Sequence, residues 1–166
     1  METPFPSRVP LSSDVRAHLA LELDRTLASL LDLRSQVKHA HWNVKGPWFV
    51  ARHQLFDALA EHLDAWSDSI AERAATLGAI AHGTTRNAAA ATEIPEYDGN
   101  AIVAEDHVRV LADRYALVSS LLRQREADAG ERGDVATQDL YTEVMRGVEL
   151  DLWFLESHLV RGAMAR

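Results

Sequence analysis

The sequence predicts an all-α protein, built as a four-helix bundle with one long connection, and three observations support this prediction. Leu and Ala dominate the apolar residues, whereas β-branched residues are sparse. Glycines and prolines gather in a few short clusters, and the segments between them repeat apolar residues at the spacing of one helix face. The 166 residues are enough to bury such a core within a single domain.

The first helix is expected over residues 14–43, and Asp14 can cap its free backbone N–H groups. Its apolar face carries Leu19, Leu23, Leu27, Leu30 and Val37. Gly46 and Pro47 then break the pattern, and because this connection is short, the next helix is expected to run antiparallel beside the first. Residues 1–13 are expected to form a flexible N-terminal tail.

The second helix is expected over 48–77, where apolar positions alternate by three and four as in the seam of a bundle. These positions are Phe56, Leu59, Leu63, Trp66, Ile70 and Leu77. The stretch 83–100 that follows contains Pro95 and a turn at 98–100, and it is longer than a tight loop needs. We therefore expect a crossover, with a short helix over 86–92 on the outside.

The third and fourth helices are expected over 102–129 and 134–162, with Asp134 capping the fourth. Two short connections on either side of a long one place the second and third helices parallel, which is the ferritin-like arrangement of a four-helix bundle. The prediction is one ferritin-like domain over 14–162, followed by a C-terminal tail at 163–166.

Composition restricts the chemistry and the partners. The chain has no cysteine, which excludes disulfides and thiolate metal sites, so metal ligands must be His and carboxylates. The net charge of -8 opposes attraction to a nucleic-acid backbone and suits cations, although ordinary solubility also explains it. No apolar segment approaches the roughly 20 residues that span a bilayer, and the N-terminus lacks a signal-peptide pattern. A cytoplasmic protein without a membrane partner is expected.

Four metal-binding side chains form one stripe on the second helix: His53, Asp57, Asp68 and Glu72. At about 100° per residue, the step from Asp57 to Asp68 leaves a rotation of only about 20°, so both pairs face one way, opposite the apolar seam. Such a face is often simply solvated. Here alanines are interspersed along the stripe where a solvated face would more often carry Lys and Arg, so a second helix can approach closely.

The two pairs cannot reach one ion within a single chain. Asp57 and Asp68 are about 16 Å apart along the helix, whereas metal–ligand bonds are about 2 Å long. An antiparallel second copy, related by a two-fold axis between His62 and Leu63, brings the first pair of one chain opposite the second pair of the other. Because a two-fold contact repeats every interaction, one dimer would hold two identical sites.

The ligand set restricts the metal but does not identify it. Imidazole and carboxylates suit Fe(II), Mn(II) or Zn(II). The chain contains no Glu-x-x-His motif, which di-iron proteins of bundle architecture direct into the core of their own helices. This absence argues against a metal centre inside one bundle and favours a site between subunits.

Several motifs resemble those of the Dps family of mini-ferritins. They are AHWNVKGPWFVARHQLFD, HLDAWSDSIAER and LGAIAHGTT in the first half of the chain, and IPEY and LDLWFLESHL in the second. The resemblance covers almost the whole chain except the N-terminal tail. It implies a dodecameric shell built from two-fold dimers that oxidises Fe(II), preferentially with hydrogen peroxide, and stores the ferric product. Such a ferroxidase and iron store would protect DNA from oxidative damage.

The resemblance also implies roles for individual residues. The ferroxidase motif of the family, which both binds and oxidises the iron, falls on His41, His53, Asp57, Asp68 and Glu72.

Trp42 resembles a tryptophan that the family places beside this site, where it intercepts stray oxidising equivalents; packing at a helix end is the alternative. The segment GDVATQDLYTE resembles the start of the family's last helix, where Asp134, Asp139 and Glu143 would line a pore that admits Fe(II). Capping by Asp134, followed by ordinary surface acids, is the alternative. His39 would bind metal only if the first helix frays.

Other functions remain open. DNA binding in the family commonly depends on a Lys-rich tail, whereas this tail offers Arg8 and little else, so weak or no DNA binding is expected and nucleoid association lacks support. A DNA-compacting protein with a vestigial metal site is one alternative. A helical dimer that holds structural Zn(II) is the other, and Zn or Mn are the metals expected besides Fe.

Overall fold

The computed structural model describes residues 3–99, 101 and 103–160, which contain five helices and no strand. The helices are α1 (Ser13–Asn43), α2 (Phe49–Thr76), α3 (Thr85–Ala91), α4 (Ala104–Glu131) and α5 (Val135–Ser157). The predicted all-α class is therefore confirmed.

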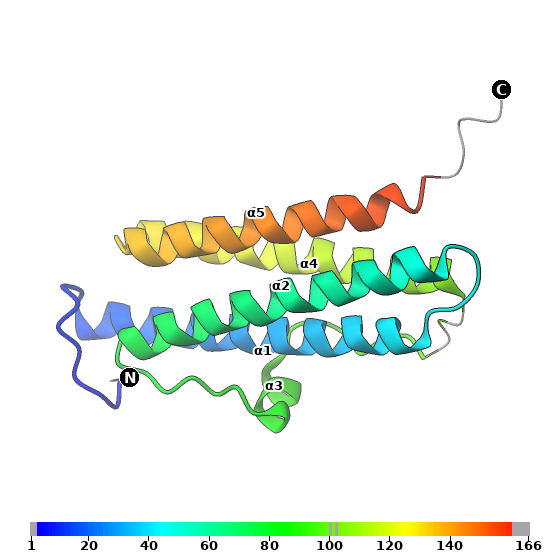
Figure 1. Cartoon of the computed structure of the whole chain (residues 1–166). Helices are drawn as coiled ribbons and strands as arrows, with labels where there is room; N and C mark the ends of the chain where they lie inside the picture. The colour runs from blue at the N-terminus through cyan, green and yellow to red at the C-terminus, as the bar shows by residue number, and fades with distance from the viewer. Residues whose placement is uncertain (1–2, 100, 102, 161–166) are drawn as a thin grey trace.

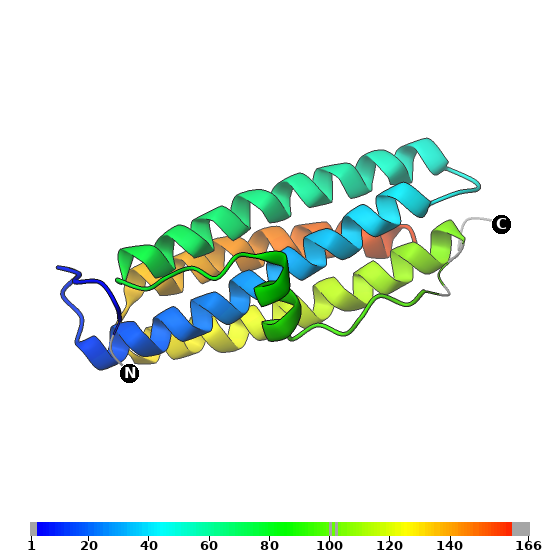
Figure 2. The ribbon, with the colours of Figure 1, turned by 90° about the horizontal axis from the view of Figure 1, so that it is seen from below.

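The four long helices pack side by side along their length, and the short α3 lies outside the bundle against α1 (Figures 1 and 2). Helices α1 and α2 form one antiparallel hairpin, and α4 and α5 form another. The connection that carries α3 returns along the bundle, so α2 and α4 run in the same direction. This is the predicted ferritin-like arrangement, including the short helix on the outside.

The start of α1 corrects one prediction. The Ser12 side chain, not that of Asp14, caps the helix and accepts the N–H of Val15 at 3.3 Å. Asp14 lies in the first turn, where a negative charge interacts favourably with the helix dipole. The helix thus begins at Ser13, one residue before the expected position.

The start of α5 agrees with the prediction, but its end does not. The Asp134 side chain caps the helix and accepts the N–H of Thr137 at 3.2 Å. The helix stops at Ser157, because His158 and the following residue donate hydrogen bonds three residues back and close the last turn. The expected end at Gly162 and the tail at 163–166 lie outside the described residues. The other helix ends fall within two residues of their expected positions.

Leucine is the most frequent residue in the core of the bundle. The leucines without measurable exposure include Leu23, Leu30, Leu33, Leu59, Leu63, Leu111, Leu122 and Leu155. Trp66, expected in this seam, is only partly buried and lies over Gly147 of α5. A Cβ atom at Gly147 would lie 2.2 Å from the Trp66 ring, so the approach of α2 to α5 requires glycine here.

The segment before α1 packs against the far end of α2. The Phe5 N–H donates to the Gly78 carbonyl at 3.0 Å, and the Ser7 hydroxyl donates to the Thr76 carbonyl at 2.9 Å. Gly78 has φ 91°, and a Cβ there would lie 2.4 Å from the Phe5 carbonyl oxygen. The described residues before α1 are therefore hydrogen-bonded to the bundle.

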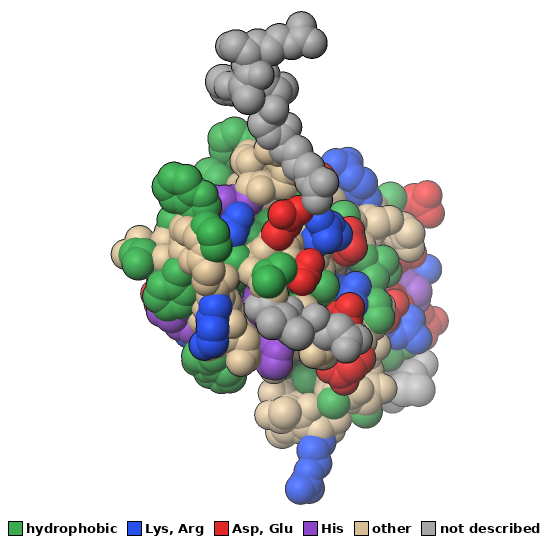
Figure 3. Space-filling model, turned by 90° about the vertical axis from the view of Figure 1, so that its right-hand side faces the viewer, with side chains coloured by type: hydrophobic (Ala, Val, Ile, Leu, Met, Phe, Trp, Pro, Cys, Tyr) green, Lys and Arg blue, Asp and Glu red, His purple; other side chains and the backbone are tan. Residues whose placement is uncertain are grey.

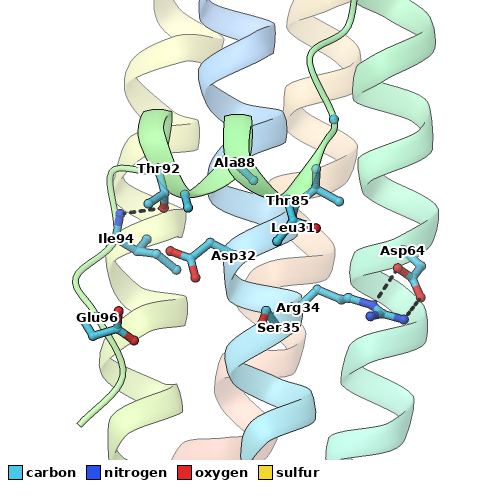
Figure 4. Close-up of a pocket in the computed structure, with 12 residues that line it drawn as sticks. Leu31, Asp32, Arg34, Ser35, Asp64, Thr85, Ala88, Thr92, Ile94 and Glu96 are labelled. Atoms are coloured by element: carbon cyan, nitrogen blue, oxygen red, sulfur yellow. Dashed lines mark hydrogen bonds and ion pairs between the residues drawn. The ribbon is translucent and has the colours of Figure 1, made fainter.

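An open groove of about 510 Å³ is lined by α1, by Asp64 of α2 and by the segment that contains α3 (Figure 4). Its walls carry Asp32 and an ion pair between Arg34 of α1 and Asp64 of α2, with N–O distance 2.9 Å. None of the predicted metal ligands lines it. Within the described part of the chain, no helix combines the length and apolar character needed to cross a membrane.

Candidate metal centre

Two predicted ligands meet where α1 turns into α2. His41 lies in the last turn of α1 and His53 in the first turns of α2. Gly46, with φ 99°, and Trp48, with φ 60°, fold the chain back between them. The imidazole rings stack with centroids 3.7 Å apart and an interplanar angle of 22°.

A reciprocal pair of hydrogen bonds fixes both rings. Nδ1 of His41 lies 3.0 Å from the His53 carbonyl oxygen, and Nδ1 of His53 lies 2.9 Å from the His41 carbonyl oxygen. A carbonyl only accepts, so each Nδ1 carries the hydrogen and each neutral ring keeps the Nε2 lone pair. Hydrogen bonding at the other ring nitrogen is how proteins orient a histidine that binds metal.

Asp57 lies beside this pair, one turn along α2 from His53. Its Oδ1 accepts from Lys38 Nζ at 2.8 Å and lies 3.8 Å from Nδ1 of His41. The hydrogen bond from Lys38 and its positive charge hold the pKa of Asp57 below its usual value. A charged carboxylate thus lies next to two imidazoles with free Nε2 atoms.

The remaining two predicted ligands lie elsewhere in the chain. Asp68 and Glu72 are exposed on the same helix, about 16 and about 22 Å further along it from Asp57. Among the residues that the structure describes, no group of three or more His, Asp or Glu side chains is arranged to hold a metal ion. One chain therefore brings together His41, His53 and Asp57 but leaves this set incomplete.

The surface around the histidine pair is apolar and aromatic. Trp42 is 68% exposed, and Lys38 Nζ lies 5.9 Å from its ring centroid. The Phe49 ring lies 5.2 Å from that of His53, and Trp48 is also exposed. Figure 3 looks onto this end of the bundle, where hydrophobic, histidine and charged side chains share the surface. An exposed apolar rim beside half a ligand set is typical of an interaction surface.

The three predicted pore residues differ in environment. Asp134 is buried, and its carboxylate accepts from Arg73 at 2.7 and 2.8 Å and from the Thr137 hydroxyl. Burial alone would raise the pKa of Asp134, but hydrogen bonds from Thr137 and Arg73 outweigh it and lower the pKa. Asp139 and Glu143 are exposed on α5.

Two features of this region were not predicted from the sequence. Lys38 was not singled out, although it precedes His41 by about one helical turn. His62 was named only to place the two-fold axis, but its Nδ1 lies 3.1 Å from both carboxylate oxygens of Asp151, which is buried. The sequence signal for this contact was Asp151, an acidic residue on the otherwise apolar face of α5.

Comparisons with known proteins agree with this fold. The family model described as a ferritin-like domain matches residues 20–165. A DNA protection during starvation protein from Agrobacterium fabrum is 37% identical over 149 residues, covering 90% of this chain and 92% of the relative. The fine tangled pili major subunit of Haemophilus ducreyi is 33% identical, covering 93% and 82%.

A solved structure gives the same result. DpsC from Streptomyces coelicolor superposes with a TM-score of 0.93 at 30% identity, covering 99% of this chain and 96% of that one. The similarity extends over nearly the full length of both chains. The chain belongs to the Dps family of mini-ferritins, within the ferritin-like group of four-helix bundles.

Proposed function

We propose that the protein is a ferroxidase that oxidises Fe(II) at sites shared by two-fold-related copies and stores the Fe(III) product inside a hollow dodecamer. One observation carries this proposal: the reciprocal hydrogen bonds between His41 and His53 leave two Nε2 lone pairs beside Asp57, and the described residues of the same chain do not complete the ligand set. Iron is the substrate and the stored product.

A second copy supplies the missing ligands. An antiparallel pairing of α2 about an axis between His62 and Leu63 brings Asp68 and Glu72 of one copy opposite the histidine pair of the other. The exposed alanines along this face of α2 permit the close approach. Each dimer then contains two equivalent sites.

The residues divide the chemistry between them. Asp57, Asp68 and Glu72 bind Fe(II) and offset its charge, and the two imidazoles supply neutral nitrogen ligands. Fe(II) displaces Lys38 from the Asp57 carboxylate. Hydrogen peroxide takes one electron from each of two Fe(II) ions and is reduced to water, which avoids the release of hydroxyl radical and protects DNA chemically. Zn or Mn can occupy the same ligands but do not supply these electrons.

Iron reaches the interior through a pore at the start of α5. Asp139 and Glu143, exposed there, attract Fe(II), and Asp134 holds the helix start in place through Arg73. Trp42, exposed beside the site, intercepts stray oxidising equivalents.

DNA binding is weak or absent in this proposal. The net charge is -8, and the N-terminal segment offers only Arg8 while hydrogen-bonding to the end of α2. A mobility-shift titration at about 150 mM salt, the physiological ionic strength, should detect no tight complex. A tight complex would favour DNA compaction instead.

Subunit mixing tests the shared site. One variant lacks the first pair (His53→Ala, Asp57→Ala) and the other lacks the second (Asp68→Ala, Glu72→Ala). Each alone should fail to oxidise Fe(II). Unfolded and reassembled together, they should regain about a quarter of the wild-type sites, since half the dimers are mixed and each mixed dimer holds one intact site.

Asp113→Ala, an exposed carboxylate change on α4, is the matched control and should remain active. Activity in either parent variant alone would contradict a shared site. Ferric absorbance that continues to grow after the sites are filled would support storage. Absorbance that stops growing once the sites are filled would favour the alternative of a helical dimer that holds structural Zn(II).

A further inference from the structure

A tyrosine–histidine pair lies near the metal centre but on another face of α1. The Tyr97 hydroxyl is 2.6 Å from Nδ1 of His107, in the first turn of α4. The Tyr97 ring also packs on His39 of α1, with centroids 4.7 Å apart. The end of α1 and the start of α4 meet at the same end of the bundle (Figure 1). His39, on which Tyr97 packs, and His41 point about 200° apart on α1. About one helix diameter, 10–12 Å, therefore separates the Tyr97–His107 pair from the histidines of the metal centre.

Both members of the pair are removed from water. His107 has an exposed fraction of 0%, Tyr97 is buried, and Nε2 of His107 has no hydrogen-bond partner among the described residues. Buried ring nitrogens are ordinarily paired, and an exception requires an explanation. Burial lowers the pKa of His107 and raises that of Tyr97, which keeps both groups neutral. The phenol is the stronger acid of the two neutral groups, so its O–H donates to Nδ1.

This arrangement suits a one-electron donor. A phenol that loses an electron becomes a strong acid and must lose its proton at the same time, which needs a base already in contact. Nδ1 of His107 is such a base, and in the buried site the proton stays where it can return. The other two tyrosines differ. Tyr141 contacts the hydroxyl of Thr26, and the buried Tyr115 hydroxyl has no partner among the described residues.

We propose that Tyr97 and His107 form a redox relay that supplies the second electron when hydrogen peroxide meets a site with only one Fe(II). This inference rests on the proposed ferroxidase function. Fe(II) gives one electron and Tyr97 the other, so the O–O bond breaks to two hydroxides, Fe(II) becomes Fe(III), and the phenol proton passes to Nδ1 of His107. The next Fe(II) returns an electron to the Tyr97 radical, and His107 returns the proton.

The relay is tested at low iron loading. Wild-type protein, Tyr97→Phe and Tyr115→Phe each receive fewer Fe(II) ions than there are sites, then hydrogen peroxide, and are frozen for EPR. A parallel sample contains a spin trap for hydroxyl radical. We expect a tyrosyl radical in the wild type and in Tyr115→Phe. We expect loss of that signal and several-fold more trapped radical in Tyr97→Phe.

His107→Asn is a second variant, which keeps the phenol but removes the base, and it should also lose the tyrosyl signal. A signal that survives in Tyr97→Phe, or that disappears in Tyr115→Phe, would refute the relay. The underlying function is checked separately with two Fe(II) per site. If wild-type protein then forms no Fe(III), the proposed ferroxidase function is wrong. If wild-type protein and Tyr97→Phe form Fe(III) at the same rate and also give the same radical signals at low iron loading, only the relay is wrong.

Discussion

At the scale of single residues, Lys38 holds the Asp57 carboxylate that we propose as a metal ligand. Its ammonium group donates to the carboxylate at 2.8 Å, and this holds the pKa of Asp57 down. A divalent cation that binds Asp57 must displace this ammonium group. We expect Lys38→Met to bind Co(II), a spectroscopic stand-in for Fe(II), several-fold more tightly in a titration of the assembled protein. Lys45→Met, on the exposed turn, is the control, and unchanged or weaker binding by Lys38→Met would oppose this view.

A second residue, Asp151, makes stability depend on pH. Burial raises its pKa, and the hydrogen bond from His62 only partly opposes this. The folded state therefore holds this proton more tightly than the unfolded state, so stability falls as pH rises from the usual Asp value of about 3.9 through the raised one.

Asp151→Asn removes the charge and keeps the shape of the side chain. We expect the free energy of unfolding of Asp151→Asn to be roughly 1 kcal/mol larger than that of the wild type near neutral pH. In acid, below the usual Asp pKa, the two free energies should become equal. Urea unfolding at a series of pH values measures the difference. Asp113→Asn, exposed on α4, should show no such trend, and a constant difference for Asp151→Asn would rule out the electrostatic cause.

At the scale of helices, the contact between α2 and α5 depends on Gly147. An added Cβ would lie 2.2 Å from the Trp66 ring. We expect Gly147→Ala to destabilise the bundle, because a clash of this kind costs about 1–3 kcal/mol and exceeds the gain of up to about 1 kcal/mol in helix propensity. Thermal unfolding measures it. Combining the change with Trp66→Leu should relieve the clash, and Gly99→Ala, which faces open space, should be neutral. A higher unfolding temperature for Gly147→Ala would mean that α2 and α5 move apart enough to accept the added methyl group without cost.

At the scale of the whole molecule, substitutions of the acids of α5 test the proposed iron uptake separately from stability. Asp139→Asn with Glu143→Gln should slow ferric core growth several-fold in the assembled shell while shifting unfolding by less than about 0.5 kcal/mol, because both side chains are exposed. Asp134→Ala should instead lose about 3 kcal/mol, because it breaks a buried ion pair and a helix cap. Undiminished core growth in the double variant would exclude these acids from the uptake route.

The proposed shell contains twelve copies of the chain. Native mass should correspond to twelve copies of the chain in the wild type, in the Asp139→Asn, Glu143→Gln double variant and in Asp134→Ala. A monomer would leave the histidine pair without Asp68 and Glu72 of a second copy, and the proposed chemistry would have no complete site.

The sequence alone determined the class of fold, the five helices and most of their ends, because apolar periodicity and glycine or proline breaks are local signals. It also indicated the stripe on α2, since residues on one helix face follow from numbering alone. The position of the α1 cap was wrong because Ser12, Ser13 and Asp14 can all cap a helix, and the choice depends on backbone geometry.

Only the tertiary structure decided which donors and acceptors face each other across helices. Three such contacts join residues from different helices or turns. They are the reciprocal hydrogen bonds between His41 and His53, the ion pair between Lys38 and Asp57, and the buried ion pair between Arg73 and Asp134. Helical spacing gives the face on which a side chain lies, but not the distance to a neighbouring helix. That distance is set by how the whole core packs, and it decides whether a nitrogen stays free to bind a metal.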